Sequence, residues 1–228
     1  MALIFLPGSG CSSNVWHHQL EFFYDGIAVN FPGHPDGDLI GSVSELADWL
    51  GLILDQHAEK SVVLVGHSFG SAVALQVAIN SHPAIKGLVL IGSGSRLKVM
   101  PMILENLARL VASEGDVPEV MLSANKGIQE PLRSEIDDAI KVNGVSALLN
   151  DFKACNEFDV SEYLSTIKVP THIIVGEKDV MTPLKYAEYL NANIQKSTLS
   201  IVPSGSHMVF AEQSNEVNII IKSFLDSL

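Results

Sequence analysis

The chain has 228 residues, 47% hydrophobic and 18% charged, which is typical of a globular protein and excludes a disordered or fibrous one. Its formal net charge of -12 excludes the basic surface with which proteins hold nucleic acid or anionic lipid. No apolar run approaches the roughly 20 residues of a membrane span. Cys11 and Cys155 show neither metal-ligand spacing nor a disulfide framework, and the opening MALIFL lacks the basic flank of a signal peptide. We expect a cytoplasmic monomer or small homo-oligomer with a small-molecule partner and no cofactor or metal.

Six short aliphatic and β-branched runs are predicted strands. None alternates apolar with polar residues, as expected of parallel strands that helices cover on both faces. The runs are 2–6, 27–31, 62–65, 87–91, 172–175 and 198–202. Between them, amphipathic or small-residue patterns predict helices at 42–57, 69–81, 183–192 and 215–227. This order predicts an open α/β fold with a six-stranded, mostly parallel sheet.

The interval from 95 to 167 breaks this alternation, because it contains no strand pattern. Three of its segments open with proline and close with glycine, which favours helices at 101–115, 118–127 and 131–144, and an amphipathic stretch follows at 145–154. An insertion between parallel strands leaves the sheet at their carboxyl ends, where such sheets bind ligands. We therefore predict an α/β core of residues 1–94 and 168–228 and a helical cap or lid at 95–167. The alternative is that the insertion merely covers an edge of the sheet.

A serine lies between two glycines in Gly66-His67-Ser68-Phe69-Gly70, after a predicted strand and before a predicted helix. This is the context of a nucleophile elbow, in which flanking glycines permit a tight turn that exposes the serine oxygen. The following helix would offer the positive end of its dipole to a developing oxyanion. Ser68 is therefore the candidate nucleophile.

A serine nucleophile needs a base and a group that orients the base. Of the eight histidines, His207 follows the last predicted strand in a small flexible turn, whereas the side chain of His67 should point away from that of Ser68. The strand at 172–175 runs into Gly-Glu-Lys-Asp, which makes Asp179 the candidate acid and Glu177 its rival.

The chain order Ser68, Asp179, His207 on an α/β sheet resembles the α/β-hydrolase superfamily, and in particular its small bacterial-type carboxylesterases with a helical cap. The stretch NFPGHP at 30–35 is similar to the DxPGHGxS stretch of that family, with Asn30 in place of the acid. The family usually begins with a further antiparallel hairpin, which this chain lacks.

The resemblance also implies an oxyanion hole. The exit of the first strand, Leu-Pro-Gly-Ser-Gly at 6–10, matches the family's oxyanion loop, with Pro7 where a histidine is usual. The donors would then be the backbone N–H groups of Ser9 and Phe69.

The resemblance implies the chemistry of the reaction more specifically than the identity of the substrate. The arginines of this chain, Arg96, Arg109 and Arg133, all lie in the insertion, and the net charge disfavours anions. We expect a serine carboxylesterase-type hydrolase that cleaves a small to medium uncharged ester through an acyl-enzyme. Its substrate pocket is predicted to be walled by Met100, Met121, Phe152 and Phe158. The alternatives are a carbon–carbon bond hydrolase or menaquinone-pathway synthase, in which Arg96 would hold a carboxylate, and a small-molecule receptor that retains the triad.

Overall fold

The computed structural model describes residues 1–56 and 61–228. Within these residues six strands form one sheet in the order β2-β1-β3-β4-β5-β6, and all neighbouring pairs are parallel. The predicted α/β fold is thus confirmed. The strands are β1 (Ala2–Leu6), β2 (Ile27–Ala28), β3 (Val62–His67), β4 (Ile85–Ile91), β5 (Thr171–Gly176) and β6 (Ser197–Val202). The strand predicted at 27–31 is shorter in the structure, where β2 spans only Ile27–Ala28. It lies at an edge of the sheet and pairs with β1 at two positions.

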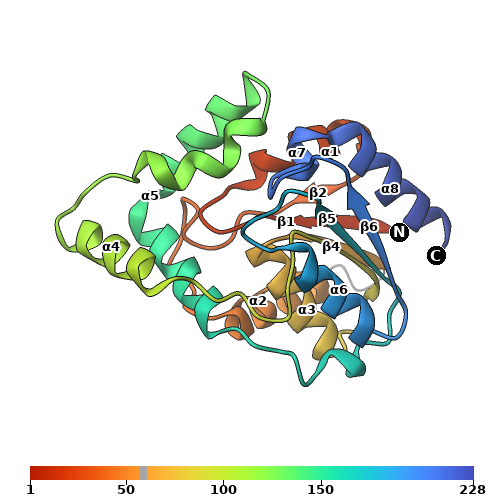
Figure 1. Cartoon of the computed structure of the whole chain (residues 1–228). Coiled ribbons are helices and arrows are strands. Elements are labelled where there is room, and N and C mark those ends of the chain that lie inside the picture. Colours follow the sequence, from red (N-terminus) through yellow and green to blue (C-terminus); the bar gives the residue numbers. More distant parts are fainter. Residues whose placement is uncertain (57–60) are drawn as a thin grey trace.

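Helices cover both faces of the sheet, which explains why the strands are apolar on both sides (Figure 1). Leu3 and Phe5 pack into one core cluster, whereas Ile4 and Leu6 pack into the other. One face carries α2 (Val43–Gln56), α3 (Phe69–Ile79) and α6 (Leu184–Asn193), and the other carries α1 (His17–Phe22), α7 (Val209–Glu212) and α8 (Ser214–Asp226).

Residue 57 of the predicted helix 42–57 lies outside the described residues. Across the described residues, no helix has both the length and the apolar character to cross a lipid bilayer.

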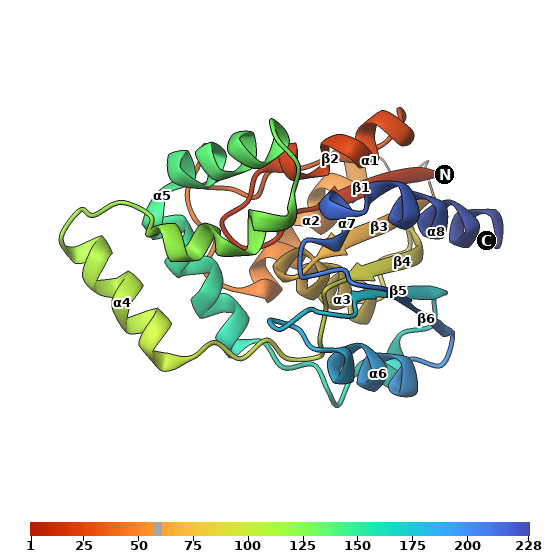
Figure 2. The same ribbon diagram turned by 45° about the horizontal axis from the view of Figure 1, so that its top comes forward.

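The segment between β4 and β5 is helical, as its pattern predicts. It contains α4 (Pro101–Ala112), the 3-10 helix η2 (Glu119–Gly127), α5 (Leu132–Glu157) and the short η3 (Leu164–Thr166). The predicted helix 118–127 is therefore a 3-10 helix, and the predicted pair at 131–144 and 145–154 forms one interrupted helix, with Gly144 at φ 81°. Helix α4 stands apart from the sheet while α5 runs between α4 and the core (Figures 1 and 2). Helix α5 packs on the core, and so does η3, whose Leu164 is buried in the same cluster as α2 and α3.

Candidate active site

Ser68 occupies a strained turn between β3 and α3. Its backbone has φ 50° and ψ -113°, a conformation that costs free energy for any residue with a Cβ. A Cβ added at Gly66 would lie 2.5 Å from the Gly70 carbonyl oxygen, and one added at Gly70 would overlap the Leu6 carbonyl group. Both flanks of the serine therefore require glycine. Within the described residues the Ser68 hydroxyl does not cap α3, so its oxygen remains for chemistry.

Two loops that follow β5 and β6 bring Asp179 and His207 together. His207 Nδ1 lies 2.8 Å from Asp179 Oδ2, and both residues are buried. The hydroxyl of Thr182 donates to the same Oδ2 at 2.7 Å, and its N–H donates to Oδ1 at 2.8 Å. Burial by itself raises the pKa of Asp179, but the bonds from His207 and Thr182 outweigh burial and hold that pKa below its ordinary value. The ionised carboxylate selects the tautomer of His207 that carries its proton on Nδ1, which leaves Nε2 as a base.

The rival acid is engaged elsewhere. The carboxylate of Glu177 accepts the N–H of Ser204 at 2.9 Å and so links the loop that carries Asp179 to the loop that carries His207.

Gly92, which follows β4, lies close to the His207 imidazole. A Cβ added at Gly92 would lie 3.1 Å from imidazole Nδ1, and φ there is 54°. Sequence reasoning missed both Thr182 and Gly92, although a threonine shortly after the acid and a glycine-rich strand exit were visible signals.

His67 supports the loop of His207. Its ring lies between the rings of His207 and Phe210, each with a centroid separation of 4.7 Å, and its Nε2 lies 3.1 Å from the His207 carbonyl oxygen. Burial holds the pKa of His67 well below its ordinary value, so the ring is neutral and donates through Nε2. The residue before the serine thus fixes the backbone of the candidate base.

The loop after β1 passes directly beside the serine. A Cβ added at Gly8 would lie 3.5 Å from Ser68 Cβ. The N–H of Gly10 donates to Asp151 Oδ2 at 2.8 Å and is therefore occupied. Among the described residues, neither the N–H of Ser9 nor that of Phe69 has a hydrogen-bond partner. These two N–H groups are the oxyanion donors that the resemblance to the α/β-hydrolase superfamily implies.

Asp151 belongs to a buried pair that sequence reasoning did not find. Its Oδ2 lies 2.9 Å from His34 Nε2, and both side chains are 1% exposed. Burial lowers the pKa of His34, but the hydrogen bond and the charge of Asp151 outweigh burial and raise it. His34 lies in the stretch NFPGHP at 30–35, in the loop after β2. The partner lies 117 residues away in α5, where no local spacing indicates it.

A cavity of about 70 Å³ opens beside Ser68. Its wall includes Ser9, Phe152, Met181 and Tyr186. Tyr186 also lines a larger surface depression of about 770 Å³, together with Arg96, and Met181 also lines one of about 560 Å³, together with His207. The small cavity beside the serine thus lies next to two larger hollows, with which it shares Tyr186 and Met181.

Of the four predicted wall residues, Phe152 lines this cavity and the other three are not among its described lining residues. Met100 precedes α4 and is 61% exposed. Phe158, which follows α5, is buried in one core cluster, and Met121, in η2, packs against the opposite cluster. Phe152 and Cys155 of α5 line this cavity together with Leu97, Lys98 and Val99, which precede α4. Met100, Met121 and Phe158 therefore stay predictions as pocket residues.

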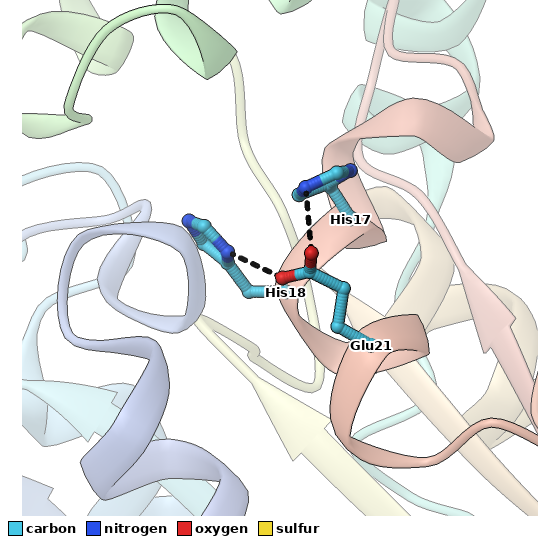
Figure 3. Close-up of side chains that lie close together, drawn as sticks. All are labelled: His17, His18 and Glu21. Atoms are coloured by element: carbon cyan, nitrogen blue, oxygen red, sulfur yellow. Dashed lines mark hydrogen bonds and ion pairs between the residues drawn. The ribbon is translucent and has the colours of Figure 1, made fainter.

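A group of metal-ligand side chains lies on the surface of α1, outside the site. His17 Nε2 and His18 Nδ1 lie 3.4 and 3.5 Å from the two carboxylate oxygens of Glu21 (Figure 3). These two pairings account for the geometry of the cluster without a metal.

Comparison with known proteins agrees with this geometry. The model of the alpha/beta hydrolase family matches residues 3–218. Proline iminopeptidase of Saccharolobus solfataricus is 26% identical over 73% of this chain and 63% of its own length. A solved structure of a thermophilic esterase is 33% identical, with a TM-score of 0.81 over 99% of this chain and 89% of that one. The structure of MenH from S. aureus is 25% identical, with a TM-score of 0.81 over 100% of this chain and 94% of that one. The chain therefore belongs to the alpha/beta hydrolase family.

Proposed function

We propose that this hydrolase cleaves a small to medium uncharged carboxylic ester, with Ser68, His207 and Asp179 as its catalytic triad. The observation that carries the proposal is the buried hydrogen bond between Asp179 and His207 in loops that share an edge of the sheet with the Ser68 turn. His207 Nε2 takes the proton of Ser68 Oγ as that oxygen attacks the ester carbonyl carbon. Asp179 stabilises the imidazolium that forms.

The negative charge of the tetrahedral intermediate falls on the former carbonyl oxygen. The N–H groups of Ser9 and Phe69 are the proposed donors to it, and the amino end of α3 adds a positive dipole. Collapse of the intermediate breaks the carbon–oxygen bond, and His207 passes its proton to the leaving alcohol. Water then attacks the acyl-enzyme by the same route and releases the acid.

The cavity beside the serine supports a short acyl group. At about 70 Å³ it is far smaller than the roughly 300–1,000 Å³ of pockets that enclose drug-sized ligands. The alcohol would leave through the wider hollow at Tyr186. Residues 95–167 act as a cap in this proposal, and the buried free thiols of Cys11 and Cys155 support a cytoplasmic enzyme.

A second candidate is a carbon–carbon bond hydrolase or menaquinone-pathway synthase. It is favoured by the similarity to MenH and by Arg96, a cation in the hollow that shares Tyr186 with the serine cavity. In that case Arg96→Ala would raise KM for a carboxylate substrate, whereas it would leave hydrolysis of an uncharged ester unchanged.

The test combines turnover with covalent labelling. Purified protein is assayed on nitrophenyl esters, thioesters and dienone acids, and a fluorophosphonate is added to label the nucleophile. We expect ester hydrolysis, one label per chain, and loss of both in Ser68→Ala, with kcat reduced by about 10⁶. Undiminished labelling of Ser68→Ala would reject the nucleophile, and turnover of dienone acids alone would favour the second candidate.

A further inference from the structure

Helix α5 holds both polar groups of Gly10 in the loop beside the nucleophile. The Gly10 N–H donates to Asp151 Oδ2 at 2.8 Å, and the Gly10 carbonyl oxygen accepts Asn143 Nδ2 at 2.9 Å. Gly10 has φ 71°, and a Cβ there would lie 2.8 Å from Leu148 Cδ1, also on α5. Asn143 and Asp151 lie on opposite sides of the break at Gly144, so both segments of α5 form a hydrogen bond to Gly10.

The Asp151 side chain is itself fixed from a third direction. His34 Nε2 faces Asp151 Oδ2 at 2.9 Å, and His34 Nδ1 faces the Pro32 carbonyl oxygen at 3.2 Å. Both ring nitrogens therefore face acceptors, and a proton on each satisfies both. A cationic imidazole next to a carboxylate forms a charge-assisted hydrogen bond, which is stronger and more directional than a neutral one. Asp151 thus joins α5, the loop after β2 and the loop after β1.

We infer that Asp151, assisted by Asn143, is a positioning residue for the oxyanion hole. Because Asp151 holds the Gly10 N–H toward α5, the neighbouring Ser9 N–H is the one left to face the reacting oxygen. Ser9 Oγ and Cys155 Sγ, 3.6 Å apart, add a further contact between α5 and the loop. The inference rests on the proposed serine-hydrolase function, and it makes α5 a fixed part of the catalytic framework: moving α5 away would release Gly10.

The test compares four variants. Asp151→Ala removes the acceptor of the Gly10 N–H, and Asp151→Asn keeps an acceptor but removes the charge. Asn143→Ala removes the donor to the Gly10 carbonyl oxygen. The matched control is Asn150→Ala, because Asn150 also joins α5 to the core, through the Ile40 carbonyl oxygen at 2.8 Å, without touching Gly10. Loss of an oxyanion donor typically lowers kcat by about 10²–10³. We expect kcat to fall by roughly 10–100-fold in Asp151→Ala and by less in Asp151→Asn and Asn143→Ala, with KM within about threefold of wild type.

A second readout separates positioning from general stability. A trifluoromethyl ketone adds to the serine and forms an oxyanion, whereas the corresponding alcohol occupies the pocket without one. The affinity for the ketone should fall in parallel with kcat/KM across the variants, while the affinity for the alcohol stays unchanged. Melting temperatures are recorded for every variant. Asp151→Ala leaves the His34 cation unpaired, so if it does not fold, Asp151→Asn and Asn143→Ala decide the question.

Three results would overturn the inference: wild-type kcat in the Gly10-contacting variants that fold, an equal loss in Asn150→Ala, or equal losses of affinity for ketone and alcohol. Failure of the proposed function has a different signature, because the wild-type protein would then neither hydrolyse esters nor react with fluorophosphonate.

Discussion

His207 Nδ1 and Asp179 Oδ2 lie 2.8 Å apart, and the hydroxyl and N–H of Thr182 bind the same carboxylate. Thr182 therefore fixes the orientation of the Asp179 carboxylate that contacts the imidazole. The carboxylate in turn links the loop after β5 to the loop after β6. The functional contribution of this arrangement is open to direct measurement.

We expect Asp179→Asn to fold normally and to lose roughly 10⁴ in kcat, because the amide favours the wrong tautomer of His207. The matched control is Glu177→Gln, an equally conservative change two residues earlier whose side chain binds the Ser204 N–H. Steady-state kinetics on a short nitrophenyl ester measure both. A larger loss in Glu177→Gln than in Asp179→Asn would show that the acid is misassigned.

Gly92→Ala should displace the imidazole of His207. The added Cβ would lie 3.1 Å from the ring, at a backbone φ of 54° that disfavours alanine. A shift of the base by a fraction of an ångström should lower kcat by about 10–100-fold. Gly41→Ala is the control, since an added Cβ there meets nothing within 4 Å. Wild-type kcat in Gly92→Ala would mean that the close approach has no catalytic consequence.

Phe152→Ala should move the acyl preference to longer chains. Phe152 lines the cavity beside Ser68, and each buried methylene contributes about 0.8 kcal/mol to binding while it fits. In the wild type, kcat/KM should rise over the first few acyl carbons and then fall. Met121→Ala is the control, because Met121, in η2, packs against a core cluster and does not line this cavity, so its loss should change melting temperature without changing preference. A wild-type optimum at twelve carbons would contradict an acyl site of this small volume.

His34→Gln should destabilise the protein most at low pH. The pKa of His34 is raised in the folded state, so its contribution to the free energy of unfolding is fully present below the unfolded pKa near about 6.5. That contribution is lost as pH rises through the folded pKa. His67 and His172 have lowered pKa values and act with the opposite sign, but they are common to both proteins and cancel in the difference. Urea unfolding of both proteins between pH 5 and about 9 measures this; a difference that does not shrink with pH would refute the charged pair.

Local patterns predict the sheet of this chain well. Buried parallel strands need apolar residues on both faces, so runs such as 62–65 stand out, and glycine around Ser68 follows from the tight turn itself. The type of helix at 118–127 was not predictable, because it depends on how the insertion packs, whereas the predicted boundary at Gly144 is present as a non-helical break within α5.

Local sequence likewise indicates some residues of the candidate site and not others. Ser68, Asp179 and His207 each follow a strand at the same edge of the sheet, which is why chain order indicates them, although their catalytic roles remain predictions. The cavity wall and the Asp151–His34 pair depend on which side of α5 meets the core. Periodicity shows that a helix has an apolar face but does not show which residue of that face reaches the nucleophile.

The sulfur of Cys155, 3.6 Å from Ser9 Oγ, gives this site a second atom that an electrophile could attack. Burial raises the pKa of Cys155 to about 12, and that of Cys11 likewise to about 12. At neutral pH the reactive thiolate is then a vanishing fraction of either residue. Reagents that depend on thiolates, such as iodoacetamide, should therefore spare both cysteines. Carbamates and phosphonates should react only at the hydroxyl of Ser68, the proposed nucleophile, although Cys155 lines the same cavity.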